Sequence, residues 1–326
     1  MRFIVYGAGA IGGALGARLH QAGHEVVLIA RGPHLAEIGR SGLRVQDPGA
    51  DVTLPVPAVG GPDEIDWRPD DVVLLTMKSN GTRDAVRALA DVADPGTAVA
   101  CVQNGVGNEP EALRHFANVY GVCVMMPAGH LTPGVVQAYS TPVTGILDIG
   151  RYPTGVDDTA RRIAAAFTAA TFVSEARPDV MRWKYRKFLG NLANAVDAAT
   201  REEPAQEELV ALLRAEGEEC LRAAGIDPVS TAEDIERRGD IMTITRFGDA
   251  PMGSSTWQSL QRGSGWTEAE HLNGEVVLLG RLHGVATPAN ELVLRTVNRM
   301  ARERLTPRSL SSRDLLDELL SESSAG

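Results

Sequence analysis

A glycine loop between a strand and a helix constrains this chain more than any other feature of its sequence. Residues 2–7 read RFIVYG, a short apolar run, and AIGGALGARLHQAG follows with a helical pattern. The glycines between them form G-x-G-x-x-G, which permits a tight turn, close approach of backbone to a pyrophosphate, and close packing of the helix on the strand. The helix start then offers amide groups and a positive dipole end to phosphates. The predicted dinucleotide-binding residues are Gly7, Ala8, Gly9, Ala10, Ile11 and Gly12.

Short Val/Ile/Leu-rich runs alternate with helical patterns through the first half of the chain. This alternation predicts an α/β domain with a parallel sheet and crossover helices. The expected strands are 2–7, 25–31, 71–78 and 96–105, followed by 118–126, 134–141 and 144–150. Proline and glycine interrupt the last three, so we expect these strands at the edge of the sheet.

The pattern changes after residue 176, where strand-like runs end and helical periodicity begins. Helices are expected at 179–200, 205–224, 267–284 and 287–305, with a long loop within 225–266 and a frayed tail at 305–326. A chain of 326 residues also exceeds the usual size of a single core. We therefore predict an α/β nucleotide-binding domain at 1–176 and an all-helical domain at 177–326.

Charge and composition exclude several classes of protein. The net charge of -10, without a basic stripe, argues against nucleic-acid binding. No stretch approaches the roughly 18 apolar residues of a membrane span, and the glycine-rich N-terminus does not suit a signal peptide. The three cysteines are widely spaced and form no metal-binding motif, so we expect reduced thiols, no metal and a cytoplasmic protein. The sequence leaves open whether the protein is a monomer or a homodimer.

Arg31 bears on the choice between NAD and NADP. A carboxylate at the end of the second strand would bind the ribose 2′-OH of NAD, but EVVLIAR ends in Arg31. An arginine there suits a 2′-phosphate, which a carboxylate would repel. We therefore predict NADPH as the cofactor, with a solvated surface arginine as the alternative.

Two later strands end in polar residues, at the sheet edge where doubly wound folds bind ligands. Lys78 follows DVVLLTM and is one of only three lysines in an arginine-rich chain, which favours a functional role. Asn104 follows AVACVQ, and Asn104-Gly105 is equally consistent with a simple turn.

The other two lysines lie in RWKYRKFLGNLANAV, residues 182–196. A helical projection predicts a buried face of Met181, Tyr185, Phe188, Leu189, Leu192 and Val196. It groups Lys184, Lys187, Asn191 and Asn194 on the other side, either as a solvated face or as a functional one. Asparagine is a poor helix former, which favours function. A partly buried lysine is a suitable general acid for the alkoxide that hydride transfer produces, but projection does not choose between Lys184 and Lys187.

The ordered set of motifs resembles the ketopantoate reductase (2-dehydropantoate 2-reductase) family. The resemblance rests on GAGAIG with Arg31, TMKS at Lys78, QNGVG at Asn104, K-x-x-x-N at Lys187, SSTWQSL at 254–260 and TEAEHLNG at 267–274. It implies a Rossmann domain, a helical domain, and NADPH-dependent reduction of ketopantoate to (R)-pantoate on the route to pantothenate and coenzyme A.

The resemblance also implies roles for individual residues. Lys187 matches the catalytic general acid and Glu268 its acidic partner, while Lys78 matches a lysine near cofactor and substrate. The implied substrate-binding residues are Asn104, Asn191 and Ser255, with Asn194 beside the position of a further family asparagine. Residue chemistry alone leaves Glu268 as a favourable first-turn carboxylate and Ser255 as a helix cap.

Two segments depart from the family pattern. Ala195 stands where the family has its second asparagine, and SSTWQS has Ser259 where the family has an acid, with bulky Trp257 nearby. Because polar pockets discriminate through unpaired groups, these changes affect the expected substrate more than the reaction. The alternatives are therefore a reductase of another keto acid or imine, and an NADP(H)-binding sensor without turnover.

Overall fold

The structure is a computed structural model that describes residues 1–245 and 253–324. The chain forms two compact units: the first is Met1–Lys184 with Ser230–Ala250, and the second is Tyr185–Val229 with Pro251–Gly326. The division falls inside the helix α6 (Val180–Asn191). The boundary predicted after residue 176 stays a prediction.

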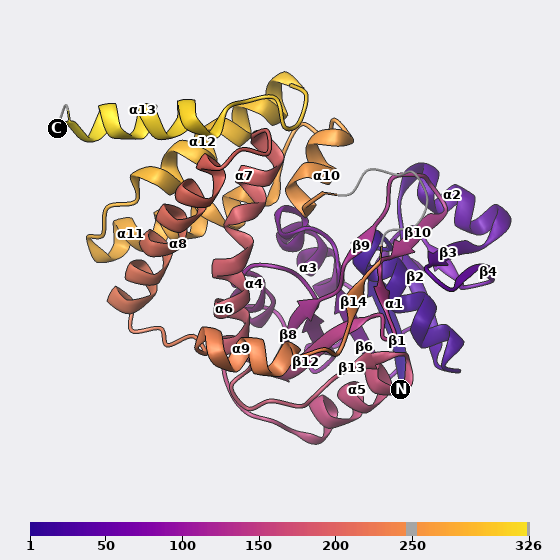
Figure 1. The fold of residues 1–326 in the computed structure, drawn as a ribbon. Helices are drawn as coiled ribbons and strands as arrows, with labels where there is room; N and C mark the ends of the chain where they lie inside the picture. Colours follow the sequence, from indigo (N-terminus) through magenta and orange to yellow (C-terminus); the bar gives the residue numbers. More distant parts are fainter. Residues whose placement is uncertain (246–252, 325–326) are drawn as a thin grey trace. The chain divides into compact units, whose positions relative to one another are not determined.

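An eight-stranded sheet forms the centre of the first unit (Figure 1), in the order β13-β12-β8-β7-β6-β1-β2-β5. Its strands are β1 (Arg2–Tyr6), β2 (Glu25–Ile29), β5 (Ala58–Val59), β6 (Asp71–Leu75), β7 (Ala98–Cys101), β8 (Asn118–Met125), β12 (Gly145–Arg151) and β13 (Phe172–Val173). All neighbours are parallel except β8 and β12, which pair antiparallel. The predicted parallel sheet is confirmed, but β8 and β12, expected at an edge, lie inside it.

Helices cover both faces of this sheet, which explains why its strands are continuously apolar. Phe3 and Val5 of β1 pack in one buried cluster, while Ile4 and Tyr6 pack in another on the opposite face. The first cluster includes side chains of α1 (Ala10–Gln21) and α5 (Asp158–Ala169), and the second includes side chains of α3 (Thr82–Ala90) and α4 (Asn108–Leu113). The helices of the first unit, besides the start of α6, are α1 (Ala10–Gln21), α2 (Gly32–Ser41), η1 (Pro62–Glu64), η2 (Ser79–Gly81), α3 (Thr82–Ala90), α4 (Asn108–Leu113), α5 (Asp158–Ala169) and α9 (Thr231–Arg238).

Two small sheets complete the first unit. One has the order β4-β3-β10-β9, from β3 (Leu43–Asp47), β4 (Ala50–Leu54), β9 (Ala128–Gly129) and β10 (Val135–Ala138). The other pairs β11 (Ser140–Thr141) with β14 (Thr243–Ile244). The run predicted as one strand at 134–141 is therefore divided between two sheets.

Asp148 of β12 attaches a distant segment of the chain to the first unit. Its carboxylate is 2% exposed. It accepts hydrogen bonds from Arg177 Nε at 2.7 Å and from Arg237 at 2.7 and 2.9 Å. Arg237 lies on α9, and β14 then pairs with β11. The long loop expected within 225–266 is thus wrong for α9 and β14, and also for α10 (Ser255–Gln261). Residues 246–252 of that prediction lie outside the described residues.

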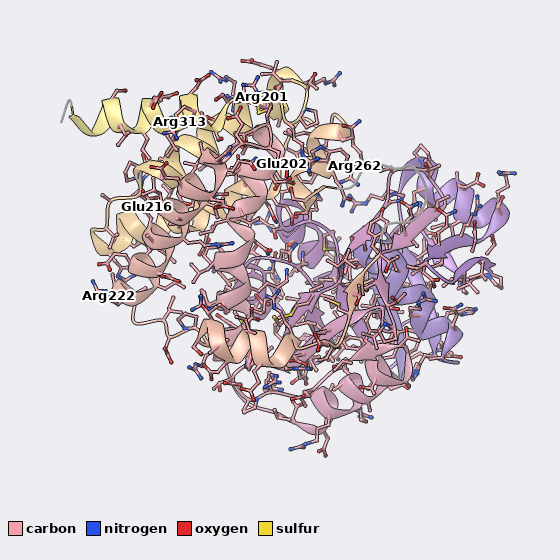
Figure 2. All side chains as sticks on the ribbon, in the orientation of Figure 1. Arg201, Glu202, Glu216, Arg222, Arg262 and Arg313 are labelled. Atoms are coloured by element: carbon pink, nitrogen blue, oxygen red, sulfur yellow. The ribbon has the colours of Figure 1, made fainter. Side chains whose placement is uncertain are left out.

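Every regular element in the described part of the second unit is a helix, as predicted. These are the end of α6, α7 (Ala193–Ala199), α8 (Ala205–Ala223), α10 (Ser255–Gln261), η3 (Glu268–His271), α11 (Asn273–His283), α12 (Pro288–Glu303) and α13 (Ser312–Ser324). Glu216 of α8, labelled in Figure 2, accepts from the amide groups of Ala289 and Asn290 at 2.8 and 2.9 Å and so fixes the start of α12. The frayed tail expected after residue 305 is wrong for α13.

The helix expected at 179–200 is divided into α6 and α7, and its predicted polar face is wrong at Lys184. Four residues of the predicted buried face are buried as expected: Phe188, Leu189, Leu192 and Val196. Met181 and Tyr185, predicted on the same face, are only half-buried. Lys184 is only 4% exposed. Its Nζ lies 2.6 Å from a carboxylate oxygen of Glu109, whose side chain is fully buried. The same Nζ donates to the carbonyl oxygens of Cys101, Gln103 and Val122 at 3.4, 3.0 and 3.2 Å. Lys184 is therefore a structural ion-pair residue of the first unit.

Removing one partner of this pair leaves the other charge buried and uncompensated. We expect Lys184→Met to lower the free energy of unfolding by about 3–5 kcal/mol. The double variant Lys184→Met, Glu109→Gln should lower the free energy of unfolding by less than the sum of the two single changes. Urea denaturation of the three variants measures this, with Arg182→Met, which loses a half-exposed pair to Asp179, as the control. Additive effects would contradict the assignment.

Candidate functional site

The glycine loop of the first unit connects β1 to α1, and each of its three glycines meets different surroundings. Gly7 has φ +110°, and a Cβ there would lie 2.7 Å from the Met77 amide nitrogen. A Cβ on Gly12 would overlap the Gly7 carbonyl oxygen and Thr76 Oγ1. At Gly9 a Cβ would meet nothing within 4 Å. Two glycines are therefore required by packing, while Gly9 faces open space of the kind that a phosphate group needs.

The residues after Gly9 fit a pyrophosphate. The amide of Gly13 donates to the Gly9 carbonyl at 2.7 Å, and the amides of Ala10, Ile11 and Gly12 precede it in the first turn of α1, where helix geometry supplies no partner. β1 lies between β2 and β6, at the point where the strand order reverses. Doubly wound sheets bind nucleotides at that point, with phosphates on the helix start.

Thr76 contacts the start of the glycine loop, and the sequence analysis did not identify it. Its hydroxyl lies 3.0 Å from the Tyr6 carbonyl oxygen and 2.8 Å from that of Gly7. The signal was present, since Thr76 is the first polar residue after the apolar strand β6.

Arg31 follows β2 at the same sheet edge as the glycine loop, because Ile29 of β2 pairs with Tyr6 of β1. It is exposed and occupies the N-cap position of α2 without a side-chain capping bond. This position leaves the guanidinium group at the surface beside the predicted dinucleotide site.

A buried hydrogen-bond network joins the two loops that carry Lys78 and Asn104. Gln103 Nε2 donates to the Met77 carbonyl and to Thr82 Oγ1, both at 2.8 Å. Asn108 Nδ2 donates to the Asn104 carbonyl at 3.0 Å and to Ser79 Oγ at 3.2 Å. Lys78 and Asn104 are both half-buried. The structure therefore holds these two predicted residues on adjoining loops of the first unit.

The predicted catalytic lysine belongs to the second unit. Lys187 is half-buried on α6, and its Nζ lies 3.5 Å from Asn191 Oδ1, one helical turn further along the chain. The Nδ2 atom of Asn191 is buried and has no hydrogen-bond partner among the described residues. A buried donor left unpaired is costly, so the Asn191 amide has unused hydrogen-bonding capacity among the described residues.

Asn194 lies on α7 and Ser255 on α10, and hydrogen bonds connect these two helices. Ser254 Oγ donates to the Asn194 carbonyl at 3.0 Å, and the Ser254 amide donates to Asp197 Oδ2 at 2.9 Å. Ser254 also caps α10 by accepting from the Trp257 amide. The alternative that Ser255 is the helix cap is therefore wrong, since Ser254 has that role and Ser255 is the first residue of α10.

Glu268 is only 5% exposed and begins the short helix η3, which Thr267 caps. η3 packs against α10, α11 and α12 within the second unit. Glu268 lies in the first turn of η3, as its sequence context predicts. Its side chain is buried. Lys187, Asn191, Asn194, Ser255 and Glu268 all belong to the second unit, whereas Lys78 and Asn104 belong to the first.

The described residues contain neither a metal-binding cluster nor a membrane-spanning helix. No group of three or more His, Cys, Asp or Glu side chains there is arranged to hold a metal ion. In the same residues, no helix combines the length and hydropathy that crossing a membrane requires.

Comparison with protein families matches both parts of the chain. The family model described as Ketopantoate reductase PanE/ApbA matches residues 3–153, and its C-terminal counterpart matches residues 179–301. The 2-dehydropantoate 2-reductase of Mesorhizobium japonicum is 29% identical over 93% of this chain and 99% of its own length. That of Pyrococcus horikoshii is 26% identical over 90% of this chain and 95% of its own.

Solved structures share the fold along nearly the whole chain. A PanE/ApbA family ketopantoate reductase from Ralstonia eutropha superposes with a TM-score of 0.78 at 27% identity, covering 93% of this chain and 99% of that one. D-mandelate dehydrogenase with NADH and anilino(oxo)acetate has a TM-score of 0.79 at 23% identity, with the same coverage, which shows likeness of fold.

The different surroundings of Gly9 and Gly12 give a matched pair of variants. Gly9→Ala adds a methyl group to open space, so we expect near-normal thermal stability but about tenfold weaker NADPH binding or worse. Gly12→Ala should lower the melting temperature, because its methyl group overlaps the Gly7 carbonyl. Differential scanning fluorimetry and NADPH fluorescence titration measure both effects. Full NADPH affinity in Gly9→Ala would exclude the loop as the phosphate site.

Proposed function

Because the chain belongs to the ketopantoate reductase family, we propose that it reduces 2-dehydropantoate (ketopantoate) to (R)-pantoate with NADPH. Family membership makes it an oxidoreductase that acts on a CH–OH group with a nicotinamide cofactor. The substrate, the cofactor preference and the residue roles are the proposal.

The observation that carries the proposal is the pair formed by Lys187 and Asn191. An ammonium donor and an amide donor lie one helical turn apart, and the amide Nδ2 is buried without an acceptor among the described residues. A 2-keto acid offers suitable acceptors in its carbonyl and carboxylate oxygens. Asn191 would then bind a substrate oxygen and orient the carbonyl toward Lys187.

Lys187 acts as the general acid in this proposal. A bound nicotinamide supplies the hydride that adds to the carbonyl carbon. Negative charge then develops on the carbonyl oxygen, and Lys187 Nζ donates a proton to it, which yields the hydroxyl group. The lysine recovers its proton from water. Glu268, buried in the same unit, is the acidic partner of the lysine and accepts a hydrogen bond from a substrate hydroxyl.

The first unit supplies the cofactor site. The loop from Gly7 to Gly12 binds the pyrophosphate, and Arg31 binds the 2′-phosphate that distinguishes NADPH from NADH. Lys78 and Asn104, on adjoining loops, bind the cofactor, and Asn104 also binds the substrate. The open space at Gly9 and the exposed position of Arg31 support this part of the proposal.

A second candidate is the same reaction on another 2-keto acid. Ala195, at the position of the family's second asparagine, is 1% exposed and packs in the core. Ser259, at the position of the family's acid, is also 1% exposed, and its hydroxyl donates to the Ser255 carbonyl at 3.2 Å. Two polar groups expected on the substrate side are thus replaced by a methyl group and a hydroxyl used within α10.

Turnover separates these candidates. We expect the fastest oxidation of NADPH with ketopantoate, compared with pyruvate, 2-ketoisovalerate, benzoylformate and a cyclic imine, and slower oxidation of NADH. Absorbance at the nicotinamide band measures each rate. A higher kcat/KM for another keto acid would favour the second candidate. Binding of NADPH without turnover of any compound would favour a sensor.

Lys187→Gln should reduce kcat by about 10²–10⁴-fold, because it removes the proton donor. Affinity for NADPH should remain near that of the wild type, since the cofactor loop belongs to the other unit. Stopped-flow turnover and fluorescence titration measure the two effects separately. Arg182→Gln, on the same helix, is the matched control and should retain activity. An equal loss of cofactor binding in Lys187→Gln would refute the assigned role.

A further inference from the structure

The imidazole ring of His34 bridges two main-chain segments of the first unit. His34 lies on α2, which Figure 1 shows close to β10. Its Nε2 lies 2.7 Å from the carbonyl oxygen of Ala8, in the glycine loop. Its Nδ1 accepts a hydrogen bond from the Gly134 amide at 2.8 Å, directly before β10. Neither contact was anticipated from the sequence.

These partners determine the tautomer of the ring. The Gly134 amide can only donate, so Nδ1 must carry a lone pair. The Ala8 carbonyl can only accept, so the proton lies on Nε2. Burial lowers the pKa of His34, which favours this neutral form. The ring of His130 packs beside it, with 4.2 Å between the ring centroids. The nearest acid on α2, Glu37, is paired with Arg40.

The Ala8 carbonyl matters because the rest of the turn is already held. The amides of Gly7 and Ala8 donate to the Ile29 carbonyl at 3.0 and 3.2 Å, and the Gly9 amide donates to the Gly7 carbonyl at 2.8 Å. Ala8 is 2% exposed, so its carbonyl oxygen depends on His34 for a partner in the described structure. That carbonyl belongs to the peptide plane immediately before Gly9. The same plane carries the Gly9 amide, and Gly9 is the N-cap residue from which α1 begins.

We propose that His34 is a positioning residue for the cofactor: its Nε2–H holds the Ala8–Gly9 peptide so that the amides at the start of α1 face the pyrophosphate. The inference rests on the proposed cofactor site and adds a residue that touches the loop without touching the ligand. The Nε2 contact carries the effect. The Nδ1 contact to Gly134 orients the ring.

Two amide substitutions separate the contacts. Glutamine can place its amide nitrogen where Nε2 lies and still donate to Ala8, whereas asparagine retains only an acceptor near the position of Nδ1. We expect His34→Gln to bind NADPH within about threefold of the wild type, and His34→Asn to bind about tenfold more weakly. With saturating NADPH, kcat should be similar in both, so that the defect appears in the KM for NADPH.

Direct titration of each protein with NADPH, followed by fluorescence, gives these affinities without relying on turnover. Equal affinities of wild type and His34→Asn would overturn the role of His34, as would a loss in His34→Gln as large as in His34→Asn. A wild-type protein that binds no NADPH would instead refute the cofactor site itself.

A measurement on the wild type avoids the risk that a variant fails to fold. Nitrogen-15 NMR of histidine-labelled protein should show His34 as the neutral Nε2–H tautomer, both before and after NADPH is added. A protonated ring or the Nδ1–H tautomer at neutral pH would overturn the proposal, because neither state provides both contacts.

Discussion

The ammonium group of Lys184 makes the contacts on which the arrangement of β7, β8 and the loop after β7 depends. It is almost fully buried, and it meets the Glu109 carboxylate together with three carbonyl oxygens from β7, the loop after β7, and β8. A buried ion pair is stabilising only when its remaining hydrogen-bonding capacity is satisfied. The three carbonyls satisfy the ammonium group, whereas the Glu109 carboxylate has no hydrogen-bond partner among the described residues apart from its ion pair with Lys184. The lysine thereby connects α6, α4 and two neighbouring strands. The loop that carries Asn104 lies between Cys101 and Glu109, which both contact Lys184. These two contacts fix the path of the loop.

The glycine loop is also held by side chains that bind main-chain carbonyl oxygens, but here the side chains are uncharged. Thr76 lies within hydrogen-bonding distance of two of its carbonyl oxygens and His34 binds a third, while Gln103 and Asn108 hold the neighbouring loops. These side chains contact main-chain carbonyl groups, and the proposed cofactor site uses the amide groups at the start of α1. A rigid loop has less ordering entropy to lose when the cofactor binds, which is how such a layer favours affinity.

Much of the fold was predictable because it rests on local patterns. The strand–glycine loop–helix unit, the parallel sheet and the helical second half all follow from periodicity and turn chemistry. The helix at 231–238 could also have been predicted, because Ser230 and Glu233 form a capping box that is visible in the sequence. We assigned this segment to a loop instead. The tail was misjudged because its small polar end concealed α13. The assignment of catalytic and binding roles stays a prediction, although the contacts of Lys187, Asn191 and Ser254 agree with a site built on helices.

The sequence by itself determined the dinucleotide loop, the alternation of strands and helices, and the rarity of lysine that drew attention to three positions. These depend on residues adjacent in the chain. Only the tertiary structure decided that Lys184 is a buried structural cation while Lys187, three residues later, remains half-buried beside Asn191. It also decided that Asp148 pairs with Arg237 and that His34 reaches Ala8. Burial and pairing depend on groups far apart in sequence, whose proximity exists only after the chain has folded.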